Sequence, residues 1–283
     1  MMKPSAAEVE LLVRMALAED APWGDVTSQA LIPEAARVSA ELVAREDGVL
    51  CGEDVFTAAM RLTDAGIATE FGVHDGDRFD KGDVLATVGG SARGVLQAEW
   101  VGLNFVQRLC GIATMTAKCV AETAGTKARI VDTRKTTPGL RVLERYAVRC
   151  GGGVNHRFSL SDAVMAKDNH LAIMKAGGVS LGDAIRKARA TLPHTTHFEV
   201  EVDRLDQIEE VLAAGVDTIM LDNFSIDNLR VGVELIAGRA LVEASGGVTL
   251  ERIREIAATG VDIISVGALT HSVRALDLGL DIQ

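Results

Sequence analysis

The sequence predicts an α/β fold in which the second half of the chain forms a parallel β-sheet closed into a barrel. From residue 129 onward, apolar runs of strand length alternate with helical segments, and the last four runs recur about every 22 residues, the length of one βα unit. The runs carry or precede charged and polar residues, as expected where barrel strands converge at their carboxyl ends. Glycine-rich loops follow the last two runs, where barrels bind phosphate. A doubly wound sheet shares the repeat, but its Gly-x-Gly-x-x-Gly fingerprint is absent from the sequence.

The first part of the chain mixes helical and extended patterns. Apolar residues spaced by three and four predict helices, and alternation between turn residues predicts strands. Glycine inside a helical pattern weakens it, so a break or kink is expected at Gly111. The expected elements are a helix at 5–19 with Ser5 as N-cap, a strand at 38–50, a short helix at 54–62, β-structure at 71–88 and a long helix from Gly94 to about Ala124.

The strand-length runs of the second part end close to residues with chemical function. Helices with capping residues separate them, for example a helix after Thr249 that ends at Gly260. The runs are 128–131 before Asp132, 163–166 before Lys167, 197–202 carrying Glu199 and Glu201, 218–221 before Asp222, 240–242 before Glu243, and 263–266 before Gly267.

Composition describes an acidic globular protein. The formal net charge is −11 and 48% of residues are hydrophobic, which argues against general nucleic-acid binding and for a sizeable core. No run reaches the roughly 18 apolar residues of a membrane span, and the first residues lack a signal-peptide pattern. Four scattered cysteines without a Cys-x-x-Cys motif are expected to be reduced core thiols. These features predict a cytoplasmic protein without nucleic-acid or membrane partners.

Positive charge is concentrated in one stretch. Between Lys127 and Arg157 there are eight Lys or Arg and two acids, a local formal charge of about +6, which suggests a site for a polyanion. The spacing of Arg141, Arg145 and Arg149 is typical of a solvated helix face. The cations at strand ends, in contrast, suit carboxylate or phosphate binding. They are Arg134, Lys135, His156, Arg157 and Lys167.

Three acids lie on the same part of the predicted barrel. Glu199 and Glu201 alternate on one strand and face the same side, and Asp222 follows the next strand. Carboxylates beside several cations suggest Mg²⁺ held together with substrate phosphates. Internal ion pairing with Lys135 and Lys167 is the alternative, and both interpretations can hold together.

Two glycine-rich segments form the predicted phosphate cradle. They are Ser245-Gly246-Gly247 and Val266-Gly267-Ala268. His271 follows the second segment and either joins the cradle or caps a helix. The pair His194 and His197 lacks a third ligand nearby, so metal binding there is not favoured. Cations, acids and a phosphate cradle together fit a polyphosphorylated substrate, a metal and a second anionic substrate, with charge stabilisation rather than a protein nucleophile.

These residues stand in motifs that resemble the quinolinate phosphoribosyltransferase family, from Gly24-Asp25-Val26-Thr27 almost to the C-terminus. The motifs are Asp132-Thr133-Arg134-Lys135-Thr136-Thr137-Pro138-Gly139, Gly151-Gly152-Gly153-Val154-Asn155-His156-Arg157, Lys167-Asp168-Asn169-His170, Glu199-Val200-Glu201-Val202, Leu221-Asp222-Asn223-Phe224, Ser245-Gly246-Gly247 and Val266-Gly267-Ala268-Leu269-Thr270-His271.

The resemblance implies an N-terminal α/β sandwich over residues 1–111, to which 270–283 returns, and an incomplete barrel of about seven strands over 112–269. It implies a homodimer, or a hexamer built from dimers, in which the N-terminal domain of one subunit covers the barrel mouth of the other.

The implied activity is that of a pentosyltransferase. Phosphoribosyl pyrophosphate and quinolinate would give nicotinate mononucleotide, pyrophosphate and CO₂, with Mg²⁺, in NAD biosynthesis. The resemblance implies that quinolinate is bound by Arg134, His156, Arg157 and Lys167. It implies contact with ribose, pyrophosphate and metal by Lys135, Glu201 and Asp222, the metal being held directly or through water. Further substrate contacts are implied for Thr133, Ser245–Gly247, Val266–Ala268 and His271. Lys135, Lys167, Glu201 and Asp222 are the expected catalytic residues.

One position departs from the family pattern. Trp100 stands where the family has an arginine that reaches a substrate carboxylate across the dimer. Either Arg93 or Arg108 substitutes for that cation, or the enzyme accepts a different pyridine or aromatic acid that stacks on Trp100. A non-catalytic sensor of a phosphate ligand is the alternative from another class, but it would not need metal-binding carboxylates.

Overall fold

The computed structural model describes residues 3–283. They form two compact units. The first comprises residues up to 117, 136–152 and 269–283, and the second comprises 118–135 and 153–268. No helix in the described part of the chain has the length and apolar character needed to cross a bilayer.

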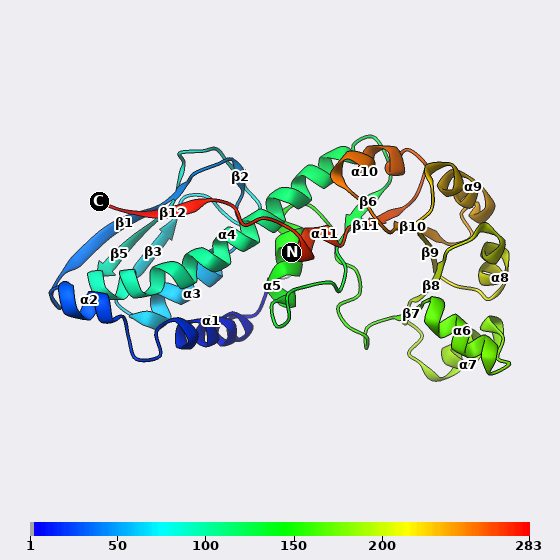
Figure 1. Cartoon of the computed structure of the whole chain (residues 1–283), viewed down its shortest axis with the longest axis horizontal. Helices are drawn as coiled ribbons and strands as arrows, with labels where there is room; N and C mark the ends of the chain where they lie inside the picture. Colours follow the sequence, from blue (N-terminus) through cyan, green and yellow to red (C-terminus); the bar gives the residue numbers. More distant parts are fainter. Residues whose placement is uncertain (1–2) are drawn as a thin grey trace. The chain divides into compact units, whose positions relative to one another are not determined.

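The first unit is built on a four-stranded antiparallel sheet with the order β12-β1-β5-β3 (Figure 1). A separate two-stranded ribbon pairs β2 with β4. The elements are α1 (Ala6–Asp20), α2 (Val26–Leu31), β1 (Arg37–Ala44), β2 (Gly48–Val49), α3 (Glu53–Thr63), β3 (Ala68–Phe71), β4 (Arg78–Phe79), β5 (Val84–Ser91), most of α4 (Ala92–Glu122), α5 (Arg141–Cys150), α11 (Ala268–His271) and β12 (Leu278–Ile282).

Local signals account for the start of this unit. Ser5 is the N-cap of α1, as predicted: its Oγ accepts the Glu8 N–H at 3.3 Å, and the Glu8 carboxylate accepts the Ser5 N–H at 2.9 Å. The expected strand at 38–50 is divided into β1 and β2. The expected short helix is confirmed as α3.

The core of the first unit lies between the sheet and helices α3 and α4. Leu42 and Leu85 from the sheet pack with Phe56 of α3 and Val106 of α4, and all four are fully buried. The four cysteines of the chain are free and buried, which confirms the predicted core thiols.

Helix α4 is continuous through Gly111, so the predicted break there is wrong. A Cβ on Gly111 would lie 2.2 Å from the Arg274 carbonyl oxygen. Glycine therefore stands at this position because the C-terminal segment passes against the helix backbone, whereas its helix propensity alone suggested a kink.

Two segments distant in sequence join the first unit. Strand β12 pairs antiparallel with β1, with Leu42 opposite Leu280. Helix α5 belongs to the same unit and buries Leu143, Tyr146 and Val148. The sequence had assigned this helix to the barrel. Arg141, Arg145 and Arg149 on this helix are half-buried rather than fully solvated as expected.

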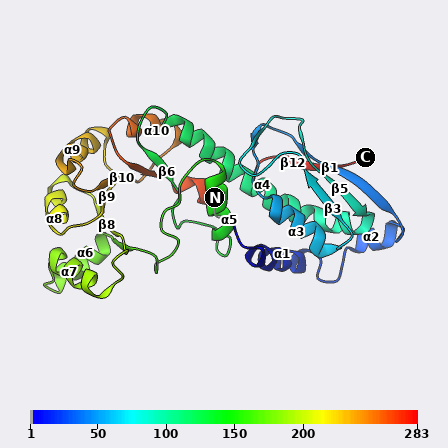
Figure 2. The ribbon, with the colours of Figure 1, turned by 180° about the vertical axis from the view of Figure 1, so that it is seen from behind.

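The second unit is an all-parallel sheet of six strands with the order β6-β11-β10-β9-β8-β7 (Figure 1). Its strands β8, β9 and β10 are also labelled in the view from behind (Figure 2). The parallel sheet confirms the predicted α/β class. Val154 forms a parallel bridge to Val131 beside β6, where the expected seventh strand would lie. The elements are β6 (Arg129–Val131), β7 (Val164–Ala166), α6 (Asp168–Ala176), α7 (Leu181–Thr191), β8 (Phe198–Val202), a 3₁₀ turn (Leu205–Gln207), α8 (Ile208–Ala213), β9 (Thr218–Asp222), α9 (Ile226–Ile236), β10 (Leu241–Ser245), α10 (Leu250–Ala257) and β11 (Ile263–Ser265).

Strand register sets the depth of the functional side chains. Glu199 pairs with Thr218, and Glu201 pairs with Met220 two residues further toward the carboxyl ends. On the other side of β9, Glu243 also pairs with Met220, and Ser245 pairs with Asp222. Glu201 and Glu243 therefore lie in one layer, Glu199 one layer deeper, and Asp222 and Ser245 one layer above.

Candidate active site

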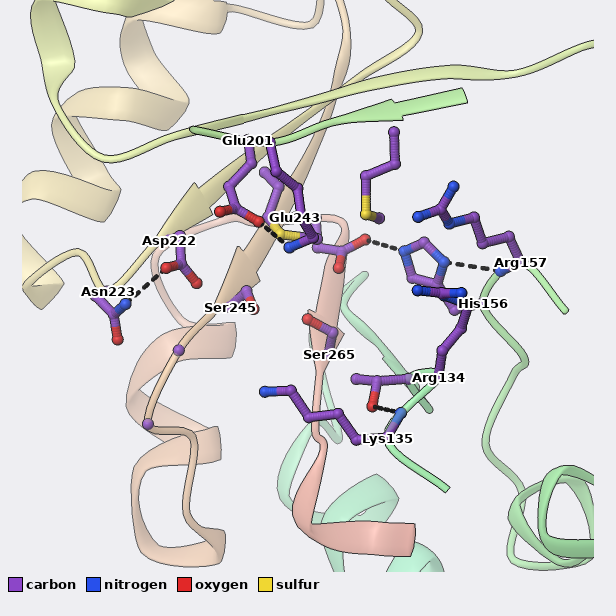
Figure 3. A pocket seen from close by; sticks show the side chains of 16 residues that line it. Arg134, Lys135, His156, Arg157, Glu201, Asp222, Asn223, Glu243, Ser245 and Ser265 are labelled. Atoms are coloured by element: carbon purple, nitrogen blue, oxygen red, sulfur yellow. Dashed lines mark hydrogen bonds and ion pairs between the residues drawn. The ribbon is translucent and has the colours of Figure 1, made fainter. Parts of the chain in front are cut away.

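A cavity of about 400 Å³ opens at the carboxyl ends of the second unit's strands. Figure 3 shows Glu201 and Asp222 toward one side, Arg134 and Arg157 toward the other, and Glu243 between them. The lining residues are Thr133, Arg134, Lys135, His156, Arg157, Met165, Lys167, Glu201, Met220, Asp222, Asn223, Glu243, Ser245, Gly246, Gly247 and Ser265.

One wall of the cavity carries the predicted cations. Arg134 and Lys135 follow β6, and the Lys135 N–H donates to Thr133 Oγ1 at 3.1 Å. Arg157 donates from Nη1 to the Ala163 carbonyl at 2.9 Å. Burial and the neighbouring Arg134 guanidinium both lower the pKa of Arg157. Two arginines held this close at the surface of a cavity form a site for a dianion.

His156 lies below this wall, with both ring nitrogens in contact with protein groups. Nδ1 accepts the backbone N–H of Arg157 at 2.7 Å. Nε2 lies 3.3 Å from an oxygen of Glu199 and 3.3 Å from an oxygen of Glu243. The backbone N–H of His156 donates to Asp132 Oδ1 at 2.8 Å.

In the cluster of His156, Glu199 and Glu243, the pKa values of His156 and Glu199 are raised above their ordinary values. Burial raises the pKa of Glu199 to about 7, against the lowering effect of His156. Burial lowers the pKa of His156, but hydrogen bonds to the two carboxylates outweigh it and raise this pKa to about 10. Because a backbone amide keeps its proton, the Arg157 contact requires an unprotonated Nδ1. The geometry therefore places a ring proton at Nε2, which faces the two carboxylates.

The opposite wall carries carboxylates with donors beside them. Lys167, the residue after β7, is ion-paired with Glu201 on β8. Asp222, the last residue of β9, accepts a hydrogen bond from Asn223 Nδ2 at 2.6 Å. Two carboxylates facing one cavity supply the hard oxygen donors that Mg²⁺ takes together with substrate phosphates. Glu201 and Asp222 therefore fit the predicted metal, and the predicted pairing of Lys167 is confirmed as well.

The loop after β10 approaches Asn223 closely. Gly246 and Gly247 both have positive φ, +89° and +57°. A Cβ on Gly246 would lie 2.2 Å from Asn223 Oδ1 and 2.7 Å from Asn223 N, whereas one on Gly247 would meet only Arg252 Nη1 at 3.9 Å. The close approach of Asn223 therefore requires glycine at Gly246, whereas Gly247 has open space around it.

Some predicted site residues do not line this cavity. Trp100 is 58% exposed on α4 in the first unit. Val266 is buried, and its N–H donates to the Val131 carbonyl at 3.0 Å. Gly267 and Ala268 follow it at the boundary of the units, and His271 contacts Ser272 Oγ at 2.5 Å in the first unit.

Other lining residues were not assigned a role at the site from the sequence. Glu243 stands two residues before Ser245 and so faces the same side of the strand, a signal that identifies it. Asn223 was visible only as part of a motif. Met165, Met220 and Ser265 line the cavity because of strand register, which the sequence does not show.

The arginines considered as replacements for the cation at position 100 are engaged elsewhere. Arg93 donates to the carbonyls of Ile32 at 2.8 Å and Gln29 at 3.2 Å. Arg108 donates to Glu144 Oε1 at 2.6 and 2.8 Å, and also to Thr137 and Thr270. These contacts tie both side chains into the first unit.

Family models match nearly the whole chain. The model described as "Quinolinate phosphoribosyl transferase, C-terminal domain" matches residues 112–281, and the corresponding N-terminal domain model matches 25–110. The chain belongs to the quinolinate phosphoribosyltransferase family.

Curated relatives of this family agree with the models. The chain is 46% identical to a nicotinate-nucleotide pyrophosphorylase (carboxylating) of Mycobacterium leprae over 278 residues, covering 95% of each chain. It is 45% identical to a probable enzyme of the same name from Bacillus subtilis over 264 residues, covering 93% of this chain and 90% of the relative.

Solved structures of the family share the fold over the full length. A nicotinate-nucleotide pyrophosphorylase from Francisella tularensis superposes with a TM-score of 0.92 at 38% identity, covering 99% of this chain and 98% of that one. One from Ehrlichia chaffeensis superposes with a TM-score of 0.91 at 38% identity, covering 100% of both chains. The family expected from the sequence motifs is therefore confirmed.

Proposed function

We propose that this member of the family transfers the phosphoribosyl group of phosphoribosyl pyrophosphate to quinolinate, giving nicotinate mononucleotide, pyrophosphate and CO₂ for NAD biosynthesis. The main observation in support of this reaction is a cavity with the neighbouring Arg134 and Arg157 on one wall and the carboxylates of Glu201 and Asp222 on the other. The names of the curated relatives, carboxylating nicotinate-nucleotide pyrophosphorylases, support the same reaction. Neither another acid substrate nor a sensor role is favoured by these relatives.

The arginine wall suits the acid substrate. Quinolinate carries two carboxylates on adjacent ring carbons, and Arg134 and Arg157 offer two guanidiniums to receive them. Lys167 adds a third cation once its ion pair with Glu201 loosens. Lys135 lies at the same strand end and is suited, as a point charge, to the pyrophosphate group.

The opposite wall suits the sugar phosphate. The backbone of Ser245–Gly247 is open to a 5′-phosphate. Glu201 and Asp222 supply negative charge beside the ribose, where positive charge develops as the bond from C1′ to the pyrophosphate oxygen breaks. The charged residues of the cavity thus have signs opposite to the charges of both substrates and of the transition state.

The bond changes then follow from the substrate's own electronics. The ring nitrogen donates its electron pair to C1′ while the pyrophosphate oxygen takes the electron pair of the breaking bond. The resulting pyridinium nitrogen stabilises the electron pair left on ring carbon 2 when the carboxylate there departs as CO₂, and a proton from solvent completes the product. No side chain has to act as a general base in either step.

Glu201 and Asp222 are the residues that would hold Mg²⁺, directly or through water. When bound, the ion neutralises the pyrophosphate and makes it a better leaving group. The protein residues orient the substrates around it.

A cytoplasmic location and a homodimer, or a dimer-based hexamer, remain predictions from the sequence.

The test is an assay of purified protein with phosphoribosyl pyrophosphate, Mg²⁺ and quinolinate, scored for pyrophosphate, CO₂ and nicotinate mononucleotide. We expect equal amounts of the three products. Pyrophosphate release with nicotinate or another aromatic acid but not with quinolinate would assign a different substrate. Tight binding of a phosphate ligand without turnover of any acid would assign a sensor.

A further inference from the structure

Two buried carboxylates of the second unit lie outside the roles assigned above. Glu199 on β8 and Glu243 on β10 have side chains that are 5% and 1% exposed, and both contact the ring of His156. Among residues 3–283, neither Glu199 Oε1 nor Glu243 Oε1 has a hydrogen-bond partner. Burying such groups without full hydrogen bonding costs stability. Glu243 lines the substrate cavity and Glu199 lines a second cavity behind it, so their presence there calls for a functional reason.

We propose that Glu199 and Glu243 are positioning residues that orient the His156 ring and, through it, hold Arg157 in place for the carboxylates of the acid substrate. The identity of the acid substrate in this inference rests on the proposed function. The positions of the side chains, in contrast, rest only on contacts within the second unit.

The imidazole joins the sheet to the loop that carries Arg157. Nε2 faces the carboxylates at 3.3 Å each, and Nδ1 accepts the Arg157 N–H at 2.7 Å. Asp132, fully buried, fixes the same loop from the other side by accepting the His156 N–H at 2.8 Å and Asn155 Nδ2 at 2.5 Å. A rotation of the ring would release the Arg157 backbone, so an acceptor for Nε2–H keeps the arginine in position.

The occupied ring nitrogens also change the role that the family resemblance implied for His156. Neither nitrogen is available to donate to a quinolinate carboxylate while these contacts persist. His156 therefore acts as a spacer beneath the substrate, and the charge that meets the carboxylate comes from Arg157.

A metal ion on His156, Glu199 and Glu243 is the competing interpretation, because their ligand atoms lie within 4.8 Å of one another. A metal on Nε2 requires that nitrogen to be unprotonated, and a metal-bound histidine normally donates from its other nitrogen. Here Nδ1 accepts a backbone N–H instead, which leaves the ring proton on Nε2. The chemistry of the ring thus favours a hydrogen-bonded cluster over a metal site.

The ring has room to move if the carboxylates are lost. A second cavity of about 400 Å³ is lined by Glu199, His156 and Glu243 together with residues near the amino ends of the strands, including Arg129 and Leu241. The cluster therefore separates this cavity from the substrate cavity. Without acceptors for Nε2–H, the imidazole is free to turn toward the second cavity.

The test compares two double variants. Glu199→Met with Glu243→Met keeps the side-chain length but removes both acceptors, whereas Glu199→Gln with Glu243→Gln keeps carbonyl acceptors for Nε2–H. With steady-state kinetics in both substrates, the Met pair should raise KM for quinolinate about tenfold or more. KM for phosphoribosyl pyrophosphate should stay within about twofold, and the Gln pair should stay close to wild type.

The thermal stability of the variants distinguishes a positioning role of Glu199 and Glu243 from a purely structural one. The Met pair should have a Tm at or above that of wild type, because apolar replacement of buried charges of similar volume is commonly neutral or stabilising. Glu144→Gln is the matched control: this carboxylate is fully buried, accepts from Arg108 at 2.6 Å in the first unit and should lower Tm without a selective change in either KM.

A measurement that does not depend on activity can test the inference even if the proposed function is wrong. A long-range ¹H–¹⁵N spectrum of histidine-labelled protein should show His156 as the Nε2–H form in wild type, with a changed signal in the Met pair and a retained one in the Gln pair. Three results for the Met pair would each overturn the inference. They are an unchanged KM for quinolinate, an equal rise in both KM values together with a fall in Tm, and an unchanged His156 signal. Absence of quinolinate turnover in wild type would instead refute the substrate, and the spectrum would still decide the role of the carboxylates.

Discussion

Lys167 and Glu201, the residues at the carboxyl ends of β7 and β8, are ion-paired in the candidate active site. The pair couples the cation that would meet the acid substrate to a carboxylate that would face the ribose. Because Glu201 is largely buried, with 13% of its side chain exposed, separating the two groups is unfavourable unless substrate charges replace each partner.

Replacing Glu201 should therefore affect the two kinetic constants differently. Glu201→Gln frees Lys167 for the substrate, so KM for quinolinate should be unchanged or lower. Loss of a carboxylate beside the developing positive charge should reduce kcat about 100-fold or more. Lys167→Met serves as the control and should raise KM for quinolinate. A Glu201→Gln variant with wild-type kcat would remove Glu201 from the mechanism.

Arg134→Ala should abolish turnover and leave the Tm within a few degrees of wild type. The reason is that Arg134 lines the cavity, where its charge serves the substrate. Its charge also helps to lower the pKa of Arg157, so its interaction with Arg157 does not stabilise the fold. Initial rates and a thermal melt measure the two effects. A variant that unfolds would show that Arg134 is structural.

The two glycines of the loop after β10 should differ in sensitivity. Gly246→Ala brings a Cβ to within 2.2 Å of Asn223 Oδ1, so the loop must shift and KM for phosphoribosyl pyrophosphate should rise about tenfold or more. Gly247→Ala meets no atom closer than 3.9 Å and should cost only the roughly 1–2 kcal/mol of a left-handed alanine. Equal effects of both substitutions would argue against a close-packed phosphate cradle.

Metal removal should stop the reaction. Chelation of divalent ions should eliminate pyrophosphate release, and added Mg²⁺ should restore it, because oxygen donors such as Glu201 and Asp222 suit this ion together with phosphates. Asp222→Asn should require about tenfold more Mg²⁺ for half-maximal rate. Full activity in excess chelator would show that the carboxylates act without a metal.

Trp100→Arg should strengthen binding of the acid substrate. A charged hydrogen bond contributes about 1.5–3 kcal/mol, and the Arg93 and Arg108 side chains are already engaged. We therefore expect KM for quinolinate to fall about tenfold in this variant. Trp100→Phe is the control and should behave like wild type. A higher KM in Trp100→Arg but not in Trp100→Phe would show that the indole itself serves the substrate.

The sequence by itself determined the α/β class, the strands of the second unit and the family. The predicted apolar runs ended within one residue of the ends of five of these strands, whereas the run at 240–242 ended three residues before β10 ends at Ser245. This agreement arises because a parallel strand must be apolar along its buried length and leave its functional groups at one end. For the same reason Arg134, Lys135, Arg157, Lys167, Glu201 and Asp222 were recognised in advance, and all of them line one cavity.

The tertiary structure decided how these groups pair. Alternation placed Glu199 and Glu201 on the same face, but neighbouring segments set their partners. Glu201 meets Lys167, which follows β7, whereas Glu199 meets His156 from the loop before β7. Gly111 likewise lies inside a continuous helix, at a point where a distant segment passes against it. Local sequence fixes the direction of a side chain, whereas its partner depends on neighbouring strands and segments that are remote in the chain.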